Sequence, residues 1–219
     1  MNRSVESPLP VLLFGAGGLA AEIVDIAARA GGPRIVGCVV DRAAGSAAAP
    51  PSGLPVHRWD DVANDGARYA AVNAIGSPER RTFIEKAEAR GFTFLTVVDP
   101  SAQIFPSAVI GSGSVIGAGT VIGAAARIGR HVFVNRGCTI GHHCEVGEFA
   151  SCYAAVHVGS FSRIGRGSEI GIGAIVIDRI SLGGGTWVGA GSLVTKDVPE
   201  GARVVGSPAR RIGSAGGPR

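Results

Sequence analysis

Two adjacent histidines, His142 and His143, stand in the stretch "TIGHHCEVGEF" at residues 139–149, in a region made mostly of small and apolar residues. An imidazole with an ordinary pKa of about 6.5 takes up and releases protons near neutral pH, so histidine is a natural general base. Imidazoles are also common metal ligands. The pair could therefore be catalytic, could bind a metal, or could be two ordinary surface residues at a bend. The pattern around the pair bears on this choice.

A six-residue repeat surrounds the pair. From residue 102 to residue 197 the chain divides into sixteen blocks of six, and the third place of every block holds an aliphatic residue or a cysteine. Glycine follows that residue in most blocks, and the first place is mostly small. A repeat of this kind predicts a parallel β-helix. The third-place residues are Ile104, Ile110, Ile116, Ile122, Ile128, Val134, Ile140, Val146, Cys152, Val158, Ile164, Ile170, Val176, Leu182, Val188 and Val194.

The repeat also predicts which side chains face the core. Residues two apart on a strand share a face, so the first and third places point inward and the last two places form a corner. Cys138, Cys144 and Cys152 take inward places, which favours a packing role. His142 and His143 fall at an outward corner, where burial does not explain them.

Three other residues near the pair are expected to matter less. His131 at a corner and His157 at an outward strand place are predicted to be surface residues. Asp178 shares the eighteen-residue column of His142, two coils further on, which is too far for a direct hydrogen bond within one chain. A zinc site built from His142, His143 and His131 has no matching sequence signature.

Residues 10–98 follow a different pattern, in which apolar strands alternate with amphipathic helices. This part predicts a small α/β unit with a parallel sheet, and the domain boundaries 1–100 and 101–219 follow from it. The turn "GAGG" joins the first strand to the first helix, a place where free N–H groups and the helix dipole favour phosphate. The predicted strands cover residues 10–14, 34–41, 69–77 and 92–100, residues 53–62 are predicted as a loop with a short strand, and the predicted helices cover residues 19–32 and 78–91.

Composition limits the function classes. The net charge is +4, and no lysine or arginine block with interleaved aromatic residues indicates a nucleic-acid surface. No apolar run of 18 or more residues predicts a membrane span, and the first residues resemble a strand and not a signal peptide, so we expect a cytoplasmic protein. The four cysteines form no CxxC pair, and neither a zinc site nor a redox motif is expected.

The whole chain resembles the left-handed β-helix acyltransferases with hexapeptide repeats. The motifs are "FGAGGLAAEIVDIA", "NAIGSPERR", "VVDPSA", "IGHHCEVGEF" and the tail "VTKDVPEGARVVGSPARRI". Within that family the chain is similar to the bacterial N-acetyltransferases of nucleotide-linked 4-amino-4,6-dideoxysugars and to the sialic-acid-type O-acyltransferases. The resemblance implies a Rossmann-like N-terminal domain, a left-handed coil, acetyl-CoA as acyl donor, and a homotrimer with active sites between subunits.

The resemblance also implies roles for individual residues. It makes His142 the general base and places the oxyanion-stabilising N–H at Ser160. His143 stands where relatives often carry an acidic residue. Either Glu145, Glu148 or a carboxylate of a neighbouring subunit supports His142 instead, or the nucleophile needs less help from the base. The expected acetyl-CoA contacts are Ser151, where relatives often have a histidine, and the backbones of Ile172 and Ala190.

The expected contacts to the nucleotide-linked sugar lie mainly in the α/β domain. They are Gly17, Gly18, Leu19, Asp41, Gly76 and, near the acyl-transfer site, Asn135. Leu19 replaces a histidine often found in relatives. The turn is not expected to bind NAD, because no second half of a dinucleotide fold follows.

The leading hypothesis is an acetyl-CoA-dependent N-acetyltransferase that acts on the amino group of a nucleotide-linked amino-deoxysugar, without a metal. O-acetylation of a sugar or of sialic acid is the alternative within the same chemistry, because the missing acid after His142 fits a changed acceptor. A binding scaffold that has lost catalysis is the alternative outside enzymes.

Overall fold

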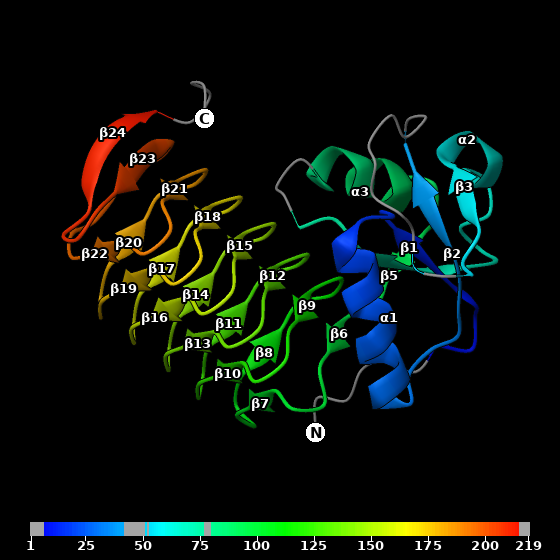
Figure 1. Ribbon diagram of the computed structural model, residues 1–219, viewed down its shortest axis with the longest axis horizontal. Coiled ribbons are helices and arrows are strands. Elements are labelled where there is room, and N and C mark those ends of the chain that lie inside the picture. Colours follow the sequence, from blue (N-terminus) through cyan, green and yellow to red (C-terminus); the bar gives the residue numbers. More distant parts are fainter. Residues whose placement is uncertain (1–6, 42–50, 52, 77–79, 215–219) are drawn as a thin grey trace. The chain divides into compact units, whose positions relative to one another are not determined.

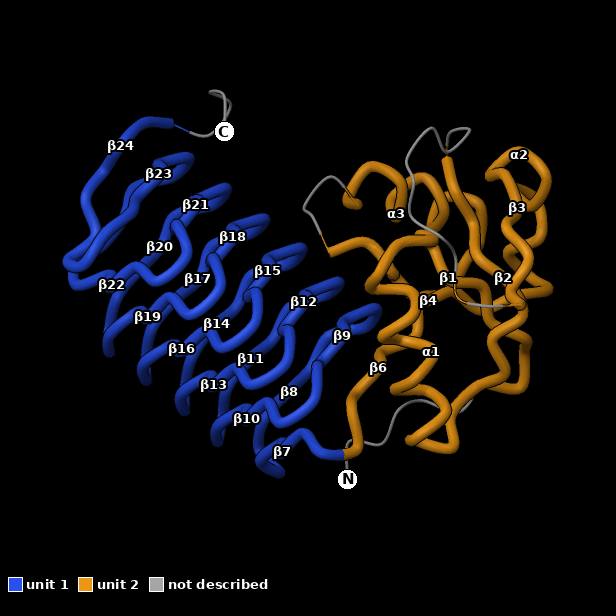
Figure 2. Tube along the Cα trace, in the orientation of Figure 1, with its two compact units in different colours: residues 1–2, 101–219 blue, residues 3–100 orange. Residues whose placement is uncertain are grey.

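The computed structural model describes residues 7–41, 51, 53–76 and 80–214. The chain divides into two compact units at the boundary between Pro100 and Ser101 (Figure 2). The first unit contains the three helices and a parallel sheet, and the second is a long stack of very short strands (Figure 1).

In the first unit, five parallel strands form one sheet in the order β3-β2-β1-β4-β5. The order reverses between β1 and β4, so the carboxyl ends of these two central strands lie side by side at a topological switch point. The elements are β1 (Val11–Phe14), α1 (Gly18–Ala30), β2 (Ile35–Val40), β3 (Val56–Arg58), α2 (Trp59–Val62), β4 (Ala70–Asn73), α3 (Arg80–Glu88), β5 (Thr93–Phe94) and β6 (Val97–Val98).

Apolar periodicity accounts for these elements. All four residues of β1 are buried, as expected for a strand in the middle of a parallel sheet. Helix α1 buries one stripe that includes Ile23 and Ile26, and it ends at Gly31 in the left-handed conformation, with φ of 60°. The ring of Phe14 lies 5.1–5.2 Å from the rings of Phe83, Phe92 and Phe94, so aromatic packing fills this core.

The second unit is a parallel β-solenoid. Each of the sixteen predicted blocks forms one two-residue strand, and the second residue of each strand is the predicted inward residue, so the repeat register is confirmed. Register partners are eighteen residues apart, as for Val121 and Thr139, so three blocks make one coil. The strands are β7 (Gln103–Ile104), β8 (Val109–Ile110), β9 (Val115–Ile116), β10 (Val121–Ile122), β11 (Arg127–Ile128), β12 (Phe133–Val134), β13 (Thr139–Ile140), β14 (Glu145–Val146), β15 (Ser151–Cys152), β16 (His157–Val158), β17 (Arg163–Ile164), β18 (Glu169–Ile170), β19 (Ile175–Val176), β20 (Ser181–Leu182), β21 (Trp187–Val188) and β22 (Leu193–Val194).

Three sheets form the sides of the solenoid, with strands from successive coils stacked in each. We call them side A (β7-β10-β13-β16-β19-β22), side B (β8-β11-β14-β17-β20) and side C (from β9 through β12, β15, β18 and β21). Two longer strands, β23 (Ala202–Val205) and β24 (Arg210–Ser214), form an antiparallel pair that continues side C.

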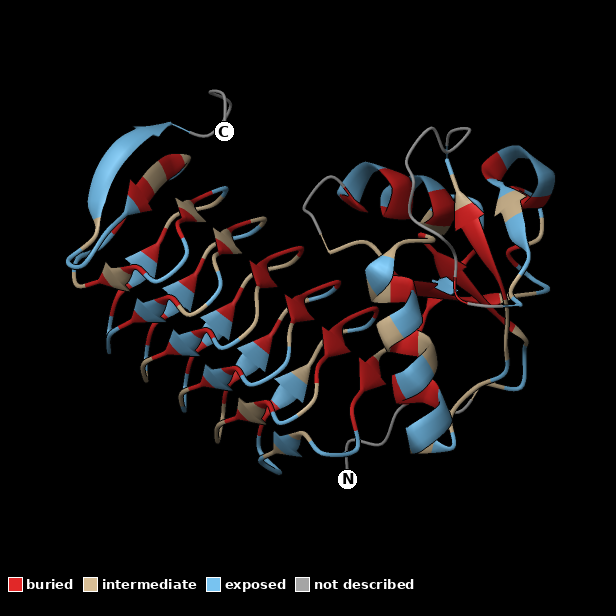
Figure 3. Cartoon of the chain, viewed as in Figure 1, coloured by how far each residue is buried: buried red, intermediate tan, exposed pale blue. Residues whose placement is uncertain are grey.

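The solenoid core consists of the inward ladders. Ile116, Ile122, Ile140 and Ile170 are at most 1% exposed, and in Figure 3 buried and exposed residues alternate along the strands. Burying an aliphatic side chain of this size contributes about 1.5–3 kcal/mol. A stack of such residues therefore compensates for strands that are only two residues long.

The three solenoid cysteines belong to this core. Cys138, Cys144 and Cys152 are fully buried, in agreement with their predicted packing role. Burial raises the pKa of the Cys138 thiol to about 11, and it also raises the pKa of Cys144 and of Cys152. Thiolates are the reactive form, so these residues are poor nucleophiles.

The corners between strands use a fixed backbone geometry. The sixth place of every block from Gly113 to Gly191 has a positive φ, and seven of these places hold residues other than glycine. His143 (φ 57°), Phe161 (φ 62°) and Arg179 (φ 62°) are three of them. The fourth place explains the repeated glycine: a Cβ on Gly141 would lie 2.7 Å from the Ser160 nitrogen, because adjacent coils approach closely there.

The structure corrects the sequence-based picture in three places. His131 is fully buried and stacks on Phe149 with ring centroids 5.0 Å apart, so its prediction as a surface residue is wrong. The strand predicted over residues 92–100 is split into β5 and β6, and a short helix, α2, follows β3. The predicted start of the second helix at Pro78 lies outside the described residues. None of the helices in the described ranges is long and apolar enough to cross a membrane.

Candidate active site at a solenoid corner

The histidine pair lies at the corner between side A and side B, directly after β13 and before β14. The fifth places of successive coils stack here in one column, which contains His142, Ser160 and Asp178. These residues line a groove of about 460 Å³ together with Thr139 and with one side of His143. We call this the histidine groove. His142 and His143 are both exposed, as the repeat register predicts.

The two imidazoles contact each other directly. Nδ1 of His142 lies 3.0 Å from Nδ1 of His143, a hydrogen bond whose direction depends on the tautomers. The two rings are nearly perpendicular, at 87°. Glu145 pairs with Arg163 and Glu148 with Arg166, at 3.6 and 3.7 Å, so these two carboxylates are engaged elsewhere. Within the chain the neighbour of His142 is therefore His143.

A column of rings and cations holds His143 in place. Its ring is almost parallel to that of Phe161 on the next coil, at 19° and 5.0 Å between centroids. The guanidinium of Arg179, one further coil along, lies 4.7 Å from the centroid of the same Phe161 ring. The edge of His142 also faces Phe161 at 5.0 Å. Phe161 and Arg179 were not predicted to belong to the site, although they follow His143 in the repeat at successive intervals of eighteen residues.

The backbone N–H groups of the fifth places lie at this corner. The second, fourth and sixth places of each block donate to the neighbouring coil, but the fifth place does not take part in that ladder. The N–H of Ser160 donates to Oδ1 of Asp178 at 2.8 Å. The N–H groups of His142 and Asp178 donate to no other described residue. Two backbone N–H groups of this column therefore have no acceptor among the described residues, and Asp178 accepts from the N–H that was expected to stabilise the oxyanion.

The expected acetyl-CoA contacts lie on another part of the solenoid. Ile172 and Ala190 are exposed at the corner that follows side C, and neither lines the histidine groove. Ser151 lies on side C itself and is fully buried in the chain. The structure does not bring these three residues together with His142 within one chain.

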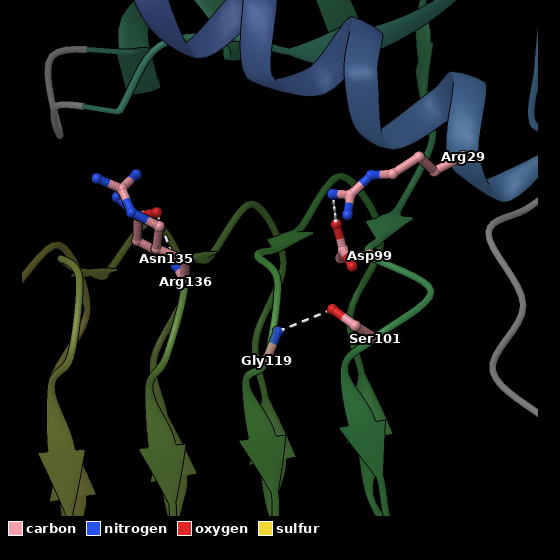
Figure 4. A network of polar contacts seen from close by, with 6 residues as sticks. All are labelled: Arg29, Asp99, Ser101, Gly119, Asn135 and Arg136. Carbon is pink, nitrogen blue, oxygen red and sulfur yellow. Dashed lines mark hydrogen bonds and ion pairs between the residues drawn. The ribbon is translucent and has the colours of Figure 1, made fainter.

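Asn135 also belongs to side C, where it directly follows β12. Its Oδ1 accepts a hydrogen bond from the backbone N–H of Arg136 at 2.7 Å, and Figure 4 shows this turn. In the same view Ser101 accepts a hydrogen bond from the N–H of Gly119 at 3.0 Å, and Arg29 pairs with Asp99 within the first unit. The two hydrogen bonds lie in turns of the solenoid, and the ion pair joins helix α1 to Asp99. Asn135 does not line the histidine groove of its own chain.

In the α/β unit, the predicted sugar-nucleotide contacts lie near the carboxyl ends of the strands. Gly17 is the N-cap of α1, and Gly18 has open space where a Cβ would stand. Leu19 is half-buried in the first turn of α1, and Gly76 follows β4. Asp41, at the end of β2, is exposed and its Oδ1 lies 2.7 Å from Nζ of Lys86. Lys86 was not expected, because it comes from α3, far along the sequence.

Asn73 is a second residue that the sequence analysis missed. It ends β4, is 1% exposed, and its Oδ1 accepts a hydrogen bond from the N–H of Ile75 at 3.0 Å. Its Nδ2 has no hydrogen-bond partner in the described part of the chain. A polar residue at the end of the buried strand "YAAVN" was the available signal.

The described residues contain no group of three or more histidine, cysteine, aspartate or glutamate side chains arranged to hold a metal ion. What the structure shows at this corner of the parallel β-solenoid is an imidazole pair beside the backbone N–H groups of the fifth places.

Comparison with known proteins shows which proteins this chain resembles. No family model matches the chain. A segment of 50 residues is 46% identical to serine acetyltransferase 2 of Arabidopsis thaliana, covering 23% of this chain. A segment of 46 residues is 46% identical to a 2,3,4,5-tetrahydropyridine-2,6-dicarboxylate N-acetyltransferase of Staphylococcus aureus, covering 21% of this chain. The chain spans about a fifth of the length of the curated relatives it matches, 16% and 19% in these two cases.

Solved structures match along nearly the full chain. The acetyltransferase domain of PglB from Neisseria gonorrhoeae, in complex with acetyl coenzyme A, is 31% identical, with a TM-score of 0.81 over 94% of this chain and 100% of that one. PerB from Caulobacter crescentus, in complex with CoA and GDP-perosamine, is 28% identical, with a TM-score of 0.84 over 96% of this chain and 100% of that one. The chain therefore belongs to the family of hexapeptide-repeat, left-handed-type β-helix sugar acetyltransferases that includes the PglB acetyltransferase domain.

Proposed function

We propose that this protein is an N-acetyltransferase that moves the acetyl group of acetyl-CoA to the amino group of a nucleotide-linked amino-deoxysugar. The observation that carries the proposal is the geometry of His142, an exposed imidazole that is hydrogen-bonded at Nδ1 and lines a groove together with Ser160 and Asp178. The neighbours support the substrate classes, since PglB is bound to acetyl coenzyme A and PerB to CoA and GDP-perosamine.

In the proposed mechanism, Nδ1–H of His142 donates to Nδ1 of His143, at the observed 3.0 Å. This tautomer leaves the lone pair of His142 Nε2 free to act as the base. The sugar amine attacks the thioester carbonyl while its proton passes to Nε2. The new C–N bond forms, the C–S bond breaks, and the departing thiolate takes the proton back from His142.

The oxyanion that develops on the carbonyl needs a donor, and the N–H of Ser160 is the proposed one. In the free chain this N–H donates to Asp178. We infer that the Asp178 carboxylate keeps water from the Ser160 N–H in the free chain. When the acyl donor enters, the carboxylate turns away and leaves this N–H available to the oxyanion.

The division of the site over two corners supports an assembly. Ser151, Ile172 and Ala190 are the proposed acetyl-CoA contacts, and they lie on side C or its corner, whereas His142 lies between sides A and B. We propose a homotrimer in which one subunit supplies His142 and its neighbour supplies the acetyl-CoA contacts. Ile172, Ile175 and Ile177 are 61%, 41% and 40% exposed, as expected for side chains that another subunit covers.

The first unit is proposed to be a Rossmann-like, sugar-nucleotide-binding domain. Its sheet order and the glycine turn at the N-terminus of α1 support this assignment, because ligands of such sheets bind beyond the carboxyl ends at the switch point. The proposed contacts are Gly17, Gly18, Leu19, Asp41 and Gly76 here, with Asn135 in the solenoid. We propose that the enzyme works in the cytoplasm.

The test measures thiol release from acetyl-CoA with a panel of nucleotide-linked amino sugars. We expect release that depends on the acceptor, and a loss of kcat of roughly 10²–10⁴-fold in His142→Ala, the usual contribution of a general base. The control is His157→Ala, an exposed histidine on side A whose Nδ1 lies 2.8 Å from Thr139 Oγ1. If no thiol release depends on an acceptor and calorimetry shows no binding of acetyl-CoA, the hypothesis of a binding scaffold without catalysis is supported instead.

A second class of substrate is worth testing because of His143. It places an imidazole where relatives often have a carboxylate, and this change could suit transfer of the acetyl group to a hydroxyl group. Ester formation with a sugar or sialic acid, and none with amino sugars, would make the protein an O-acetyltransferase.

A further inference from the structure

The histidine groove continues past His142 onto the first two coils of the solenoid, within the same hollow of about 460 Å³. The residues that line this part have no polar side-chain atom, and they are Phe105, Val121, Gly123 and Ala124. We call this part the apolar end of the groove. The polar groups of the proposed site, by contrast, lie on the following coils.

The floor of the groove is bare backbone. Five fourth-place residues stack along it at intervals of eighteen residues, and they are Phe105, Gly123, Gly141, Gly159 and Ile177. A Cβ on Gly123 would lie 2.7 Å from the nitrogen of His142, so the close approach of the coils requires glycine there. In this column Phe105 is therefore a large side chain next to a floor of three glycines.

Phe105 leaves its aromatic ring open to a ligand. The residue is 47% exposed, and its ring makes no aromatic or cation–π contact with any residue that the structure describes. Phe161 at the same corner is instead packed between His143 and Arg179. Aromatic side chains that line a groove are suited to hold an apolar part of a small molecule.

The order of groups along the corner indicates which substrate reaches the apolar end. Ala124, His142 and Ser160 occupy the fifth places of successive coils. In the proposed mechanism, the thioester oxygen lies at the N–H of Ser160 and the attacking amine lies beside His142. The remainder of the acceptor then extends away from Ser160, over Ala124 and toward Phe105, along coils that are about 4.8 Å apart.

The lining of the apolar end favours an apolar part of this acceptor. A hydroxymethyl group placed against Phe105, Val121 and Ala124 would lose hydrogen bonds with water and would find no side-chain partner among them. A methyl group at the same position has no hydrogen bonds to lose, and its burial is favourable. The acetyl group does not need this surface, because it lies on the Ser160 side of His142.

We propose that Phe105 is a specificity-determining residue, which packs against a methyl group of the acceptor sugar where a fully hydroxylated sugar carries a hydroxymethyl group. This inference rests on the proposed function for the reaction and for the direction in which the acceptor lies. The contact between Phe105 and a sugar methyl group is measured without any acetyl transfer.

The first test compares two acceptors that share the nucleotide and the amine and differ only in the methyl or hydroxymethyl group. Wild type is expected to prefer the methyl-bearing sugar in kcat/KM by roughly 10–100-fold, the usual discrimination of an apolar pocket. Phe105→Ser should reduce this preference about tenfold, mainly by raising the KM for the methyl-bearing sugar, while the KM for acetyl-CoA stays unchanged. Phe105→Leu keeps an apolar side chain and should retain most of the preference. Val109→Ser is the matched control, since Val109 is an exposed apolar residue of the same coil and does not line the histidine groove.

The second test uses saturation-transfer NMR with the methyl-bearing sugar nucleotide in the absence of acetyl-CoA. Saturation of the protein should reach the sugar methyl group in wild type and in Phe105→Leu, and much less of it in Phe105→Ser. Because no reaction takes place, this measurement decides the contact even if no acceptor is acetylated. Failure of the proposed function is thereby distinguishable from failure of this inference.

Four outcomes would overturn the proposal. Equal preference for the methyl-bearing sugar in wild type and Phe105→Ser would make Phe105 an ordinary exposed residue of the first coil, and so would equal saturation of the methyl group. An altered preference between acetyl-CoA and propionyl-CoA, with the acceptor preference unchanged, would assign the apolar end to the acyl group. An equal loss in Val109→Ser would show a general effect of surface polarity.

Discussion

His142 and His143 carry the same side chain, but their backbone conformations and ring contacts at the corner differ. The backbone of His143 is in the left-handed region, and its ring stacks on Phe161, which is covered in turn by Arg179. His142 instead meets Phe161 edge-on and lines the histidine groove beside Ser160. At the scale of single residues, the more constrained imidazole is therefore suited to orient its neighbour, and the other is suited to accept a proton.

Replacement of His143 separates these roles. His143→Phe keeps an aromatic ring for the stack on Phe161 but removes the hydrogen-bond acceptor, so we expect kcat to fall about two- to tenfold, the value of one hydrogen bond of about 0.5–1.5 kcal/mol. His143→Asp restores an acceptor and tolerates the left-handed backbone, so it should retain or raise kcat. Steady-state kinetics with both substrates varied measures the effect.

The position of the proton on His142 in these variants distinguishes a residue that supports the base from one that takes part in catalysis. Nitrogen NMR of the imidazoles should show His142 protonated at Nδ1 in wild type and in His143→Asp, but not in His143→Phe. A loss in His143→Phe as large as that in His142→Ala would mean that the two imidazoles act as one unit.

At the scale of elements, the solenoid strands are too short to be stable alone. Each has two residues, one inward and one outward, and the inward residues form the ladders that hold successive coils. The glycine at the fourth place allows the coils to approach, as at Gly141 against Ser160. The position of the corner that carries His142 therefore depends on the packing of side chains along the whole ladder.

Truncation of one inward residue should reveal this dependence. Ile122 is fully buried on β10, so Ile122→Ala is expected to lower the free energy of unfolding by about 2–5 kcal/mol, the sum of lost burial and a residual cavity. Val109, at the outward place of β8, is 53% exposed, and Val109→Ala should change stability by less than about 0.5 kcal/mol. Denaturant unfolding at fixed protein concentration makes the comparison, and equal losses would contradict the ladder as the source of stability.

At the scale of the whole molecule, the proposed site is divided over separate corners of the solenoid. His142 follows β13, whereas Ile172 follows β18, and the two residues line no common groove in one chain. The proposed homotrimer would complete the site with a second copy of the chain, and its closed rotational symmetry would repeat the same contact around the assembly.

Subunit mixing tests this division. His142→Ala and Ile172→Glu should each be nearly inactive alone, because one lacks the base and the other blocks the acetyl-CoA contact. Co-refolded in equal amounts, they should recover roughly a quarter of wild-type activity, the fraction of interfaces that combine two intact halves. Sedimentation should show a trimer for both variants. No recovery from well-formed trimers would place the whole site within one chain.

Much of this architecture follows from the sequence alone. The third-place residues from Ile104 to Val194 predict a parallel β-solenoid, because stacking of successive six-residue blocks buries these aliphatic side chains in a continuous core. The same register determines that His142 and His143 are exposed at a corner and that Cys138, Cys144 and Cys152 are packed inside. These predictions are confirmed because they depend only on local periodicity, and the same pattern recurs in every block of the repeat.

Only the tertiary structure decides which residues meet across coils and turns. The Nδ1 contact of the two histidines, the capture of the Ser160 N–H by Asp178, the stack of His143, Phe161 and Arg179, and the burial of His131 against Phe149 all depend on rotamers. Spacing in the sequence brings such residues into one column, but rotamers and backbone direction determine whether they touch. For the same reason the repeat places His142 at an exposed corner, whereas the structure shows which imidazole contacts it.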